Sequence, residues 1–205
     1  MTSLQGLLSD LTSGEETRAE IAVPLLIDLG EDAIPALLDL TLFGDVDSRW
    51  WALRTLAQSP LSRADWLIPF LNDSASEVRQ CAALGLAGKA DESATRPLIR
   101  ALSDEDGMVS SLAVNALVRI GSAAVPSLIE AVKRRPDGSS FAHRVEGIAP
   151  QSARIHALRA LAEIGDHRAI PIMMKVMDED SALLQHWAKE GLERLGLDMV
   201  YIKPV

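Results

Sequence analysis

Cysteine, aromatic residues and long apolar segments are all scarce in this chain of 205 residues. The single cysteine, Cys81, excludes an intramolecular disulfide and fits a reducing compartment. No run approaches the roughly 18 apolar residues of a membrane span, and the N-terminal segment lacks the basic region of an export signal. We therefore expect a cytoplasmic protein that has no membrane partner.

Positive charge is also in short supply, because 20 Lys and Arg residues stand against 29 Asp and Glu residues. The formal net charge is −9, and the sequence pI is near 4.9. A protein that binds a phosphate backbone needs a net basic face. The charge balance therefore argues against a nucleic-acid partner.

Sequence motifs of catalysis are missing as well. The chain has no G-x-S-x-G, H-E-x-x-H, G-x-G-x-x-G or P-loop pattern. Its four histidines are scattered, and no second metal-binding residue lies at a helical spacing from His156. Many acidic residues fall in the turns between expected helices, where carboxylates cap free N–H groups. These patterns favour a non-enzymatic protein with no catalytic residue, no metal site and no cofactor.

The chain does contain a repeat. Six alanines are each followed by a leucine four residues later, and successive alanines are 30, 30, 31, 44 and 31 residues apart. The alanines are Ala22, Ala52, Ala82, Ala113, Ala157 and Ala188, and the leucines are Leu26, Leu56, Leu86, Leu117, Leu161 and Leu192. Each pair lies on the apolar stripe of a helix, which must stack against its neighbours to be buried.

Each of the first five of these A helices is followed by a second, B helix. Prolines mark the start of most B helices, and glycines are placed to end A helices in the left-handed conformation. The prolines are Pro35, Pro97, Pro126 and Pro171, and the glycines are Gly30, Gly121, Gly165 and Gly196. Pro69 falls late in the second B helix and predicts a kink or a shortened helix there.

The repeat predicts an all-α fold, a right-handed α-solenoid of about five helical pairs plus a capping helix, in one domain over residues 1–205. The predicted pairs are 14–43, 46–72, 75–103, 106–134 and 152–178, with a C-terminal cap at 181–196. The step of 44 residues marks an inserted loop at 134–151. Leucines in the first 11 residues form an amphipathic turn that caps the other end.

Two segments carry a family resemblance: SEVRQCAALGLAGKADESATRPLIRALSDED and SARIHALRALAEIGDHRAIPIMMKVMDED. They resemble HEAT repeats, and more narrowly the short bacterial HEAT-like repeats of phycobilisome (bilin) lyase subunits. The resemblance covers roughly residues 14 to 196. It implies an armadillo-like helical fold and a protein-binding scaffold. If the chain is part of an enzyme, the resemblance implies a lyase-type subunit, with a bilin or a biliprotein as partner.

The inserted loop is the first candidate site. It replaces an acidic turn with cations and one aromatic residue, and long loops in repeat arrays are often binding elements. Its candidate partner-binding residues are Arg134, Arg135, Phe141, His143 and Arg144. The loop fits an acidic protein surface or an anionic ligand, or else it folds back on the acidic turns of its own chain.

Trp50 and Ile155 are the second candidate. Both occupy a row of the A helices that is otherwise polar, so we expect them to be exposed partner-binding residues. The alternative is that Trp50 covers Phe43 or a neighbouring helix end. Cys81 and His156 fall in a row that we assign to the core, together with Ile21 and Trp51.

Three arginines in equivalent positions, Arg49, Arg79 and Arg154, resemble the arginine ladder of HEAT repeats. The resemblance implies a structural role in which they pair with turn acids such as Asp47 and Glu77. The function that the sequence favours is a non-enzymatic interaction scaffold or adaptor with a protein partner. The alternative is a subunit of a bilin-lyase-like complex or a biliprotein chaperone.

Overall fold

The computed structural model describes residues 3–134 and 150–197. These residues form helices joined by short turns, with no β-strand among them. The chain divides into two compact units, unit 1 at residues 1–94 and unit 2 at residues 95–205. The prediction of one domain over the whole chain stays a prediction.

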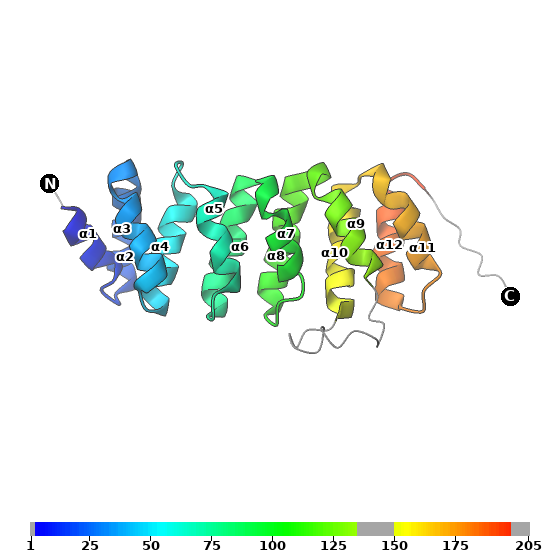
Figure 1. Cartoon of the computed structure of the whole chain (residues 1–205), viewed down its shortest axis with the longest axis horizontal. Coiled ribbons are helices and arrows are strands. Elements are labelled where there is room, and N and C mark those ends of the chain that lie inside the picture. Colours follow the sequence, from blue (N-terminus) through cyan, green and yellow to red (C-terminus); the bar gives the residue numbers. More distant parts are fainter. Residues whose placement is uncertain (1–2, 135–149, 198–205) are drawn as a thin grey trace. The chain divides into compact units, whose positions relative to one another are not determined.

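Unit 1 contains a short first helix, two helical pairs and the A helix of a third pair, in chain order (Figure 1). Its helices are α1 Leu4–Leu11, α2 Glu16–Asp28, α3 Ile34–Phe43, α4 Val46–Gln58, α5 Ala64–Leu67 and α6 Ser76–Lys89, with 3₁₀ turns η1 Gly30–Asp32, η2 Ile68–Asn72 and η3 Glu92–Ala94. Helix α1 buries Leu7 and Leu11, which confirms the expected N-terminal amphipathic turn. Helix α5 is only four residues long, and Pro69 stands in the 3₁₀ turn that follows it, so the shortened B helix is confirmed.

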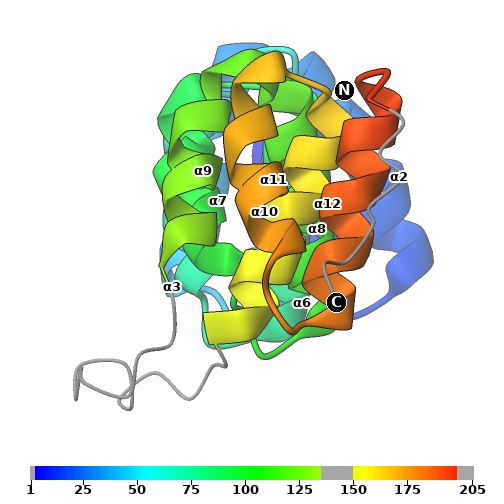
Figure 2. The ribbon, with the colours of Figure 1, turned by 90° about the vertical axis from the view of Figure 1, so that its right-hand side faces the viewer.

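Unit 2 continues the same alternation of helices. Its helices are α7 Thr95–Ala101, α8 Gly107–Ile120, α9 Val125–Lys133, α10 Pro150–Ile164, α11 Ile170–Met177 and α12 Ala182–Arg194, with 3₁₀ turns η4 Gly121–Ala123 and η6 His167–Ala169. Helix α12 packs against both α10 and α11, as Figure 2 shows. The repeated A and B helices make the fold an all-α solenoid.

The core of both units is the predicted ladder. All six alanines and all six leucines of the ladder are buried. Small residues next to them allow close helix packing: a Cβ added to Gly85 of α6 lies only 2.8 Å from the Cβ of Ala57 on α4. Alanine and glycine therefore set how closely neighbouring A helices pack.

Residues with positive φ end the A helices except α4, whose C-cap Ser59 has φ −62°, and four of them are the predicted glycines. Gly30, Gly121, Gly165 and Gly196 have φ values of 59°, 72°, 66° and 77°. Helix α6 has no glycine at this position, and Ala90 takes the left-handed conformation there with φ 50° and ψ 37°. This is the one non-glycine residue with positive φ in the described part of the chain.

Among residues 3–134 and 150–197, no single helix is long and apolar enough to cross a membrane. One pair, Gly107–Ala123 with Val125–Lys133, passes the test only when the two are taken together, and it is bent by 120°.

Candidate functional site

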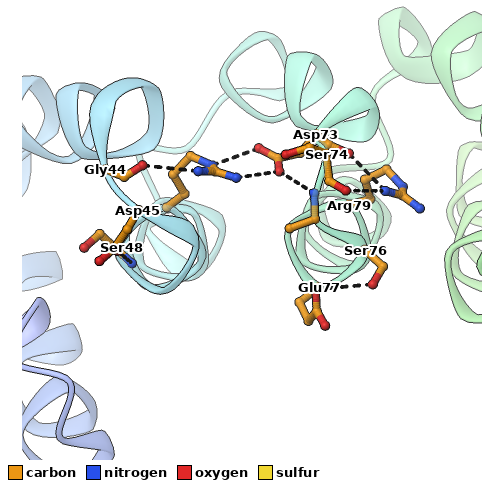
Figure 3. Close-up of polar contacts among 10 residues, drawn as sticks. Gly44, Asp45, Ser48, Asp73, Ser74, Ser76, Glu77 and Arg79 are labelled. Atoms are coloured by element: carbon orange, nitrogen blue, oxygen red, sulfur yellow. Dashed lines mark hydrogen bonds and ion pairs between the residues drawn. The ribbon is translucent and has the colours of Figure 1, made fainter.

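Arg49 and Arg154 occupy equivalent positions in their A helices, and each forms an ion pair with the turn of the next repeat. Arg49 on α4 donates from Nε and Nη2 to the two carboxylate oxygens of Asp73 at 3.0 and 2.8 Å (Figure 3). Its Nη1 also donates to the Gly44 carbonyl at 3.2 Å. The two side chains are 17% and 9% exposed. Arg49 therefore ties the turn before α4 to the turn before α6.

Asp73 is held ionised by this network. Burial raises the pKa of its carboxyl, but hydrogen bonds from Arg49 and the Ala75 N–H, together with the charge of Arg49, outweigh burial and leave the pKa below its usual value. The same turn is held by Arg79, which donates to the Asp73 and Ser74 carbonyls at 3.0 and 3.3 Å (Figure 3). Asp73 and its turn are thus fixed from both flanking A helices.

Unit 2 repeats the arrangement with Arg154. Its Nε donates to the Val132 carbonyl at 2.7 Å, and its Nη2 lies 2.9 Å from both carboxylate oxygens of Glu179. The carboxylate partners of Arg49 and Arg154 are therefore 24 and 25 residues further along the chain. Both partners are turn acids, as expected, although Arg49 pairs with Asp73 and not with Asp47. Each arginine reaches the turn of the next repeat because stacking brings that turn within range. These contacts stabilise the fold, and we assign them no part in a binding site.

The two apolar candidates are less exposed than the sequence predicts. Trp50 on α4 and Ile155 on α10 are both half-buried. Trp50 is shielded because its ring meets the ring of Trp51 edge-on, with centroids 4.8 Å apart and planes at 84°. The guanidinium of Arg54 lies 5.2 Å from the Trp50 ring and 5.0 Å from the Trp51 ring, and it pairs with Glu20 at 3.8 Å. Trp50 thus belongs to an aromatic and cationic cluster on the surface of α4.

Of the candidate partner-binding residues in the inserted loop, only Arg134 belongs to the described part of the chain. Arg134 directly follows α9 and is exposed. Arg135, Phe141, His143 and Arg144 lie outside the described residues. The partner-binding role of these residues stays a prediction.

Some residues assigned to the core lie on the surface instead. Ile21 on α2 is 66% exposed, and Trp51 is half-buried. Consecutive positions on a helix are about 100° apart, so the residue before a ladder alanine lies beside the buried stripe, and its exposure varies from the buried Cys81 to the exposed Ile21. Leu25 on α2 and Leu84 on α6 are exposed as well. Helix α4 packs against both α2 and α6. We name as the A-helix face of unit 1 the exposed Ile21, Leu25 and Leu84 together with the half-buried Trp50 and Trp51.

A cavity of 280 Å³ adjoins Trp50 and Trp51. It lies where the end of α1, the start of α2 and the start of α4 meet, and its lining residues are Leu11, Thr12, Gly14, Glu16, Asp45, Asp47, Ser48, Trp50 and Trp51. Asp45 caps α4 by accepting from the Ser48 N–H at 2.8 Å. Hydrogen bonds from the hydroxyl and the N–H of Ser48 lower the pKa of the Asp45 carboxyl. The cavity therefore combines two indole rings with carboxylates.

The two residues that could suggest catalysis have structural surroundings. Cys81 is buried, and burial raises the pKa of its thiol to about 12. Nδ1 of His156 lies 2.9 Å from the Leu102 carbonyl, which is a backbone partner. Among residues 3–134 and 150–197, no group of three His, Cys, Asp or Glu side chains is arranged to hold a metal ion. These observations fit the interpretation of Cys81 and His156 as packing residues.

Sequence reasoning missed the cavity and the apolar face. The signals were the adjacent tryptophans at 50 and 51 and the acids at 45 and 47, which were read separately as core, surface and capping residues. Glu16 and Thr12 come from another helix pair, and only the packing of α1 and α2 against α4 brings them to the same cavity. Predicting the apolar face requires the rotation of each helix about its axis, and the position of a residue relative to the ladder alanine does not give that rotation.

Comparisons with known proteins agree with this architecture. The family model for HEAT repeats matches residues 64–140, and the model for the PBS lyase HEAT-like repeat matches residues 153–179. None of the curated proteins is a significant match to the sequence. The family is therefore indicated by the repeats themselves.

Several solved structures share the fold at low sequence identity. An archaeal HEAT-like repeats protein from Thermococcus onnurineus NA1 has a TM-score of 0.59 and 16% identity, over 99% of this chain and 84% of that one. An engineered protein has a TM-score of 0.54 and 22% identity, over 95% and 99% of the two chains. The complex of CpcE and CpcF of phycocyanin lyase from Nostoc sp. PCC7120 gives 0.50 and 18%, over 96% and 78%. At these identities the likeness shows the fold alone.

Proposed function

Because the chain is a HEAT-repeat protein that carries a PBS lyase HEAT-like repeat, we propose that it is a non-enzymatic interaction scaffold for a protein partner. HEAT-type helices present long ordered surfaces, and function resides in the residues displayed on them. The proposal places the scaffold in the cytoplasm, which its single cysteine fits.

The A-helix face of unit 1 is the observation that carries this proposal. Ile21 and Leu84 are 66% and 62% exposed, and they flank the half-buried Trp50 and Trp51 on consecutive A helices. Exposed apolar residues gathered on one face, with tryptophan among them, are typical of protein interfaces. The exposed Arg134 marks where the inserted loop begins, and we propose the loop residues and Ile155 as further contacts.

A pair of matched double variants tests the face. Ile21→Glu/Leu84→Glu places two charges on it, whereas Leu42→Glu/Leu183→Glu makes the same change at residues that are 63% and 59% exposed on α3 and α12. Burying an unpaired charge in an interface is costly, so the first variant should lose its captured partner and the second should keep it. The measurement is capture by the immobilised protein, quantified by mass spectrometry for wild type and both variants.

Either of two results would contradict the scaffold. Equal capture by both double variants would remove the A-helix face as the binding surface. Absence of any specifically captured protein, combined with turnover of a small substrate, would overturn the scaffold itself. Circular dichroism of the variants controls for folding, which surface substitutions change by only about 0.5 kcal/mol.

The PBS lyase HEAT-like repeat at residues 153–179 favours a second candidate, a subunit of a bilin-lyase-like complex or a biliprotein chaperone. Because the Cys81 thiol is buried and its pKa is about 12, we do not assign it a role in bilin attachment. The chain would then hold a bilin or a biliprotein non-covalently. Mixing the purified protein with a linear tetrapyrrole tests this candidate, and an unshifted visible spectrum, with and without a candidate partner subunit, counts against it.

A further inference from the structure

We propose that the cavity between α1, α2 and α4 binds the side chain of a lysine or arginine from a positively charged segment of a partner protein. This inference rests on the proposed scaffold function and specifies the chemistry of the partner. The cavity lies in unit 1, and its lining includes the core residue Leu11 and the helix cap formed by Asp45 and Ser48, but no arginine of the ladder.

The aromatic part of the cavity suits a cation. Trp50 and Trp51 both line the cavity, and their rings stand nearly perpendicular to each other at 84°. Among aromatic side chains, the face of the indole ring attracts a cation most strongly. Arg54 lies over the same rings and shows that this cluster already accommodates a guanidinium, although Arg54 does not line the cavity.

The charged part of the cavity points to the same ligand. Glu16, Asp45 and Asp47 line it, and no lysine or arginine does. Within the described ranges, Glu16 and Asp47 have no ion-pair partner, whereas the nearby Arg49 is engaged with Asp73 and Arg18 with Asp10. The start of α4 carries the opposing partial positive charge of a helix N-terminus, but Asp45 already caps it. Two unpaired carboxylates therefore remain to attract a cation.

The size and the charge of the protein select a basic segment as the occupant. A volume of 280 Å³ is slightly below the range of about 300–1,000 Å³ for ligand pockets, so the cavity suits one long side chain rather than a large cofactor. The net charge of −9 attracts a positively charged segment over a long range and repels an acidic one.

Calorimetric titration with an octa-lysine peptide tests the cavity. Glu16→Gln/Asp47→Asn removes the two unpaired carboxylates, and Glu31→Gln/Asp32→Asn removes two exposed carboxylates of η1, which do not line the cavity. The first variant should bind roughly tenfold more weakly than wild type, whereas the second should bind within about twofold, because only the first changes contact charges. An octa-glutamate peptide should not bind.

A second pair of variants tests the aromatic walls independently of charge. Trp50→Leu removes one wall, and Trp187→Leu removes a half-buried tryptophan on α12 that also lies beside an arginine, with Arg159 at 5.7 Å from its ring. We expect several-fold weaker peptide binding for Trp50→Leu alone. Titration with free arginine distinguishes a peptide site from a site for a small cation, which should bind much more weakly.

The outcomes separate the cavity from the scaffold. Equal losses for the two charge variants would mean general attraction to an acidic protein, and absence of binding to wild type would mean no cation site, so either result refutes the cavity. If the Ile21→Glu/Leu84→Glu variant still loses its captured partner in those cases, the scaffold stands without the cavity. If the peptide result refutes the cavity and the Ile21→Glu/Leu84→Glu variant also keeps its captured partner, both proposals are refuted.

Discussion

Replacing Gly85 by alanine sets two physical effects against each other at the contact between α4 and α6. Alanine favours a helix interior over glycine by about 1 kcal/mol. However, the added Cβ would lie 2.8 Å from the Cβ of Ala57 and 3.0 Å from Cδ1 of Leu67. Leu67 can rotate away, but Ala57 has no side-chain freedom, so the two helices must separate.

The packing cost should exceed the gain in helix propensity. Overpacking a close contact typically costs about 1–3 kcal/mol. After subtraction of the propensity gain, Gly85→Ala should lower the free energy of unfolding by about 1 kcal/mol, within a range from about zero to 2. Gly88 lies on the same helix with no atom within 4 Å of its added Cβ, so Gly88→Ala should raise the free energy of unfolding by up to about 1 kcal/mol.

Urea unfolding of both variants, followed by far-ultraviolet circular dichroism, provides the measurement. The midpoints should move in opposite directions from wild type while the slopes stay unchanged. Gly191→Ala on α12 is an intermediate case. The atoms nearest its added Cβ belong to the flexible end of Met173, at 2.6 and 2.8 Å, and the Ala162 Cα lies at 3.1 Å. If Gly85→Ala proves as stable as Gly88→Ala, the inference that small residues set the helix spacing is refuted.

Three further changes follow from the local geometry. Ala90→Gly should raise the free energy of unfolding by about 1 kcal/mol in urea titrations, because glycine relieves the left-handed strain; no gain would show that the strain is absent. Asp73→Asn should cost about 2 kcal/mol at pH 7. Because folding lowers the pKa of Asp73, its contribution to the free energy of unfolding is present above about pH 4 and fades as the pH falls through the folded pKa. The stabilities of the variant and wild type should therefore converge in acid. A difference that stays constant with pH would contradict this. Cys81, buried with a pKa of about 12, should react with iodoacetamide only after unfolding, and rapid labelling of the native protein would contradict its burial.

The helical framework was predictable because its signals are local. An alanine and a leucine four residues apart lie on one stripe of a helix whatever the tertiary context, and a glycine with positive φ ends a helix through its own backbone. The same holds for Pro69, which limits a helix through its missing N–H. Each of these features appears in the structure where the sequence places it.

The arginine pairing shows where such reasoning stops. The expectation was pairing with turn acids such as Asp47, and Arg49 in fact reaches Asp73 at the next turn. That choice depends on how closely two repeats stack and on the direction in which the long side chain extends. Neither quantity is contained in a spacing of residues along one helix.

By itself, the sequence determined the all-α repeat, its helix ends and the buried ladder of alanines and leucines, since these depend on local backbone preference and helical periodicity. Only the tertiary structure decided that Ile21 faces solvent, that Trp50 and Trp51 share one cluster, and that Glu16 joins Asp47 around a cavity. The reason is that exposure and proximity depend on the rotation and stacking of whole helices. The surface that we propose for partner binding therefore emerges only when the repeats are packed.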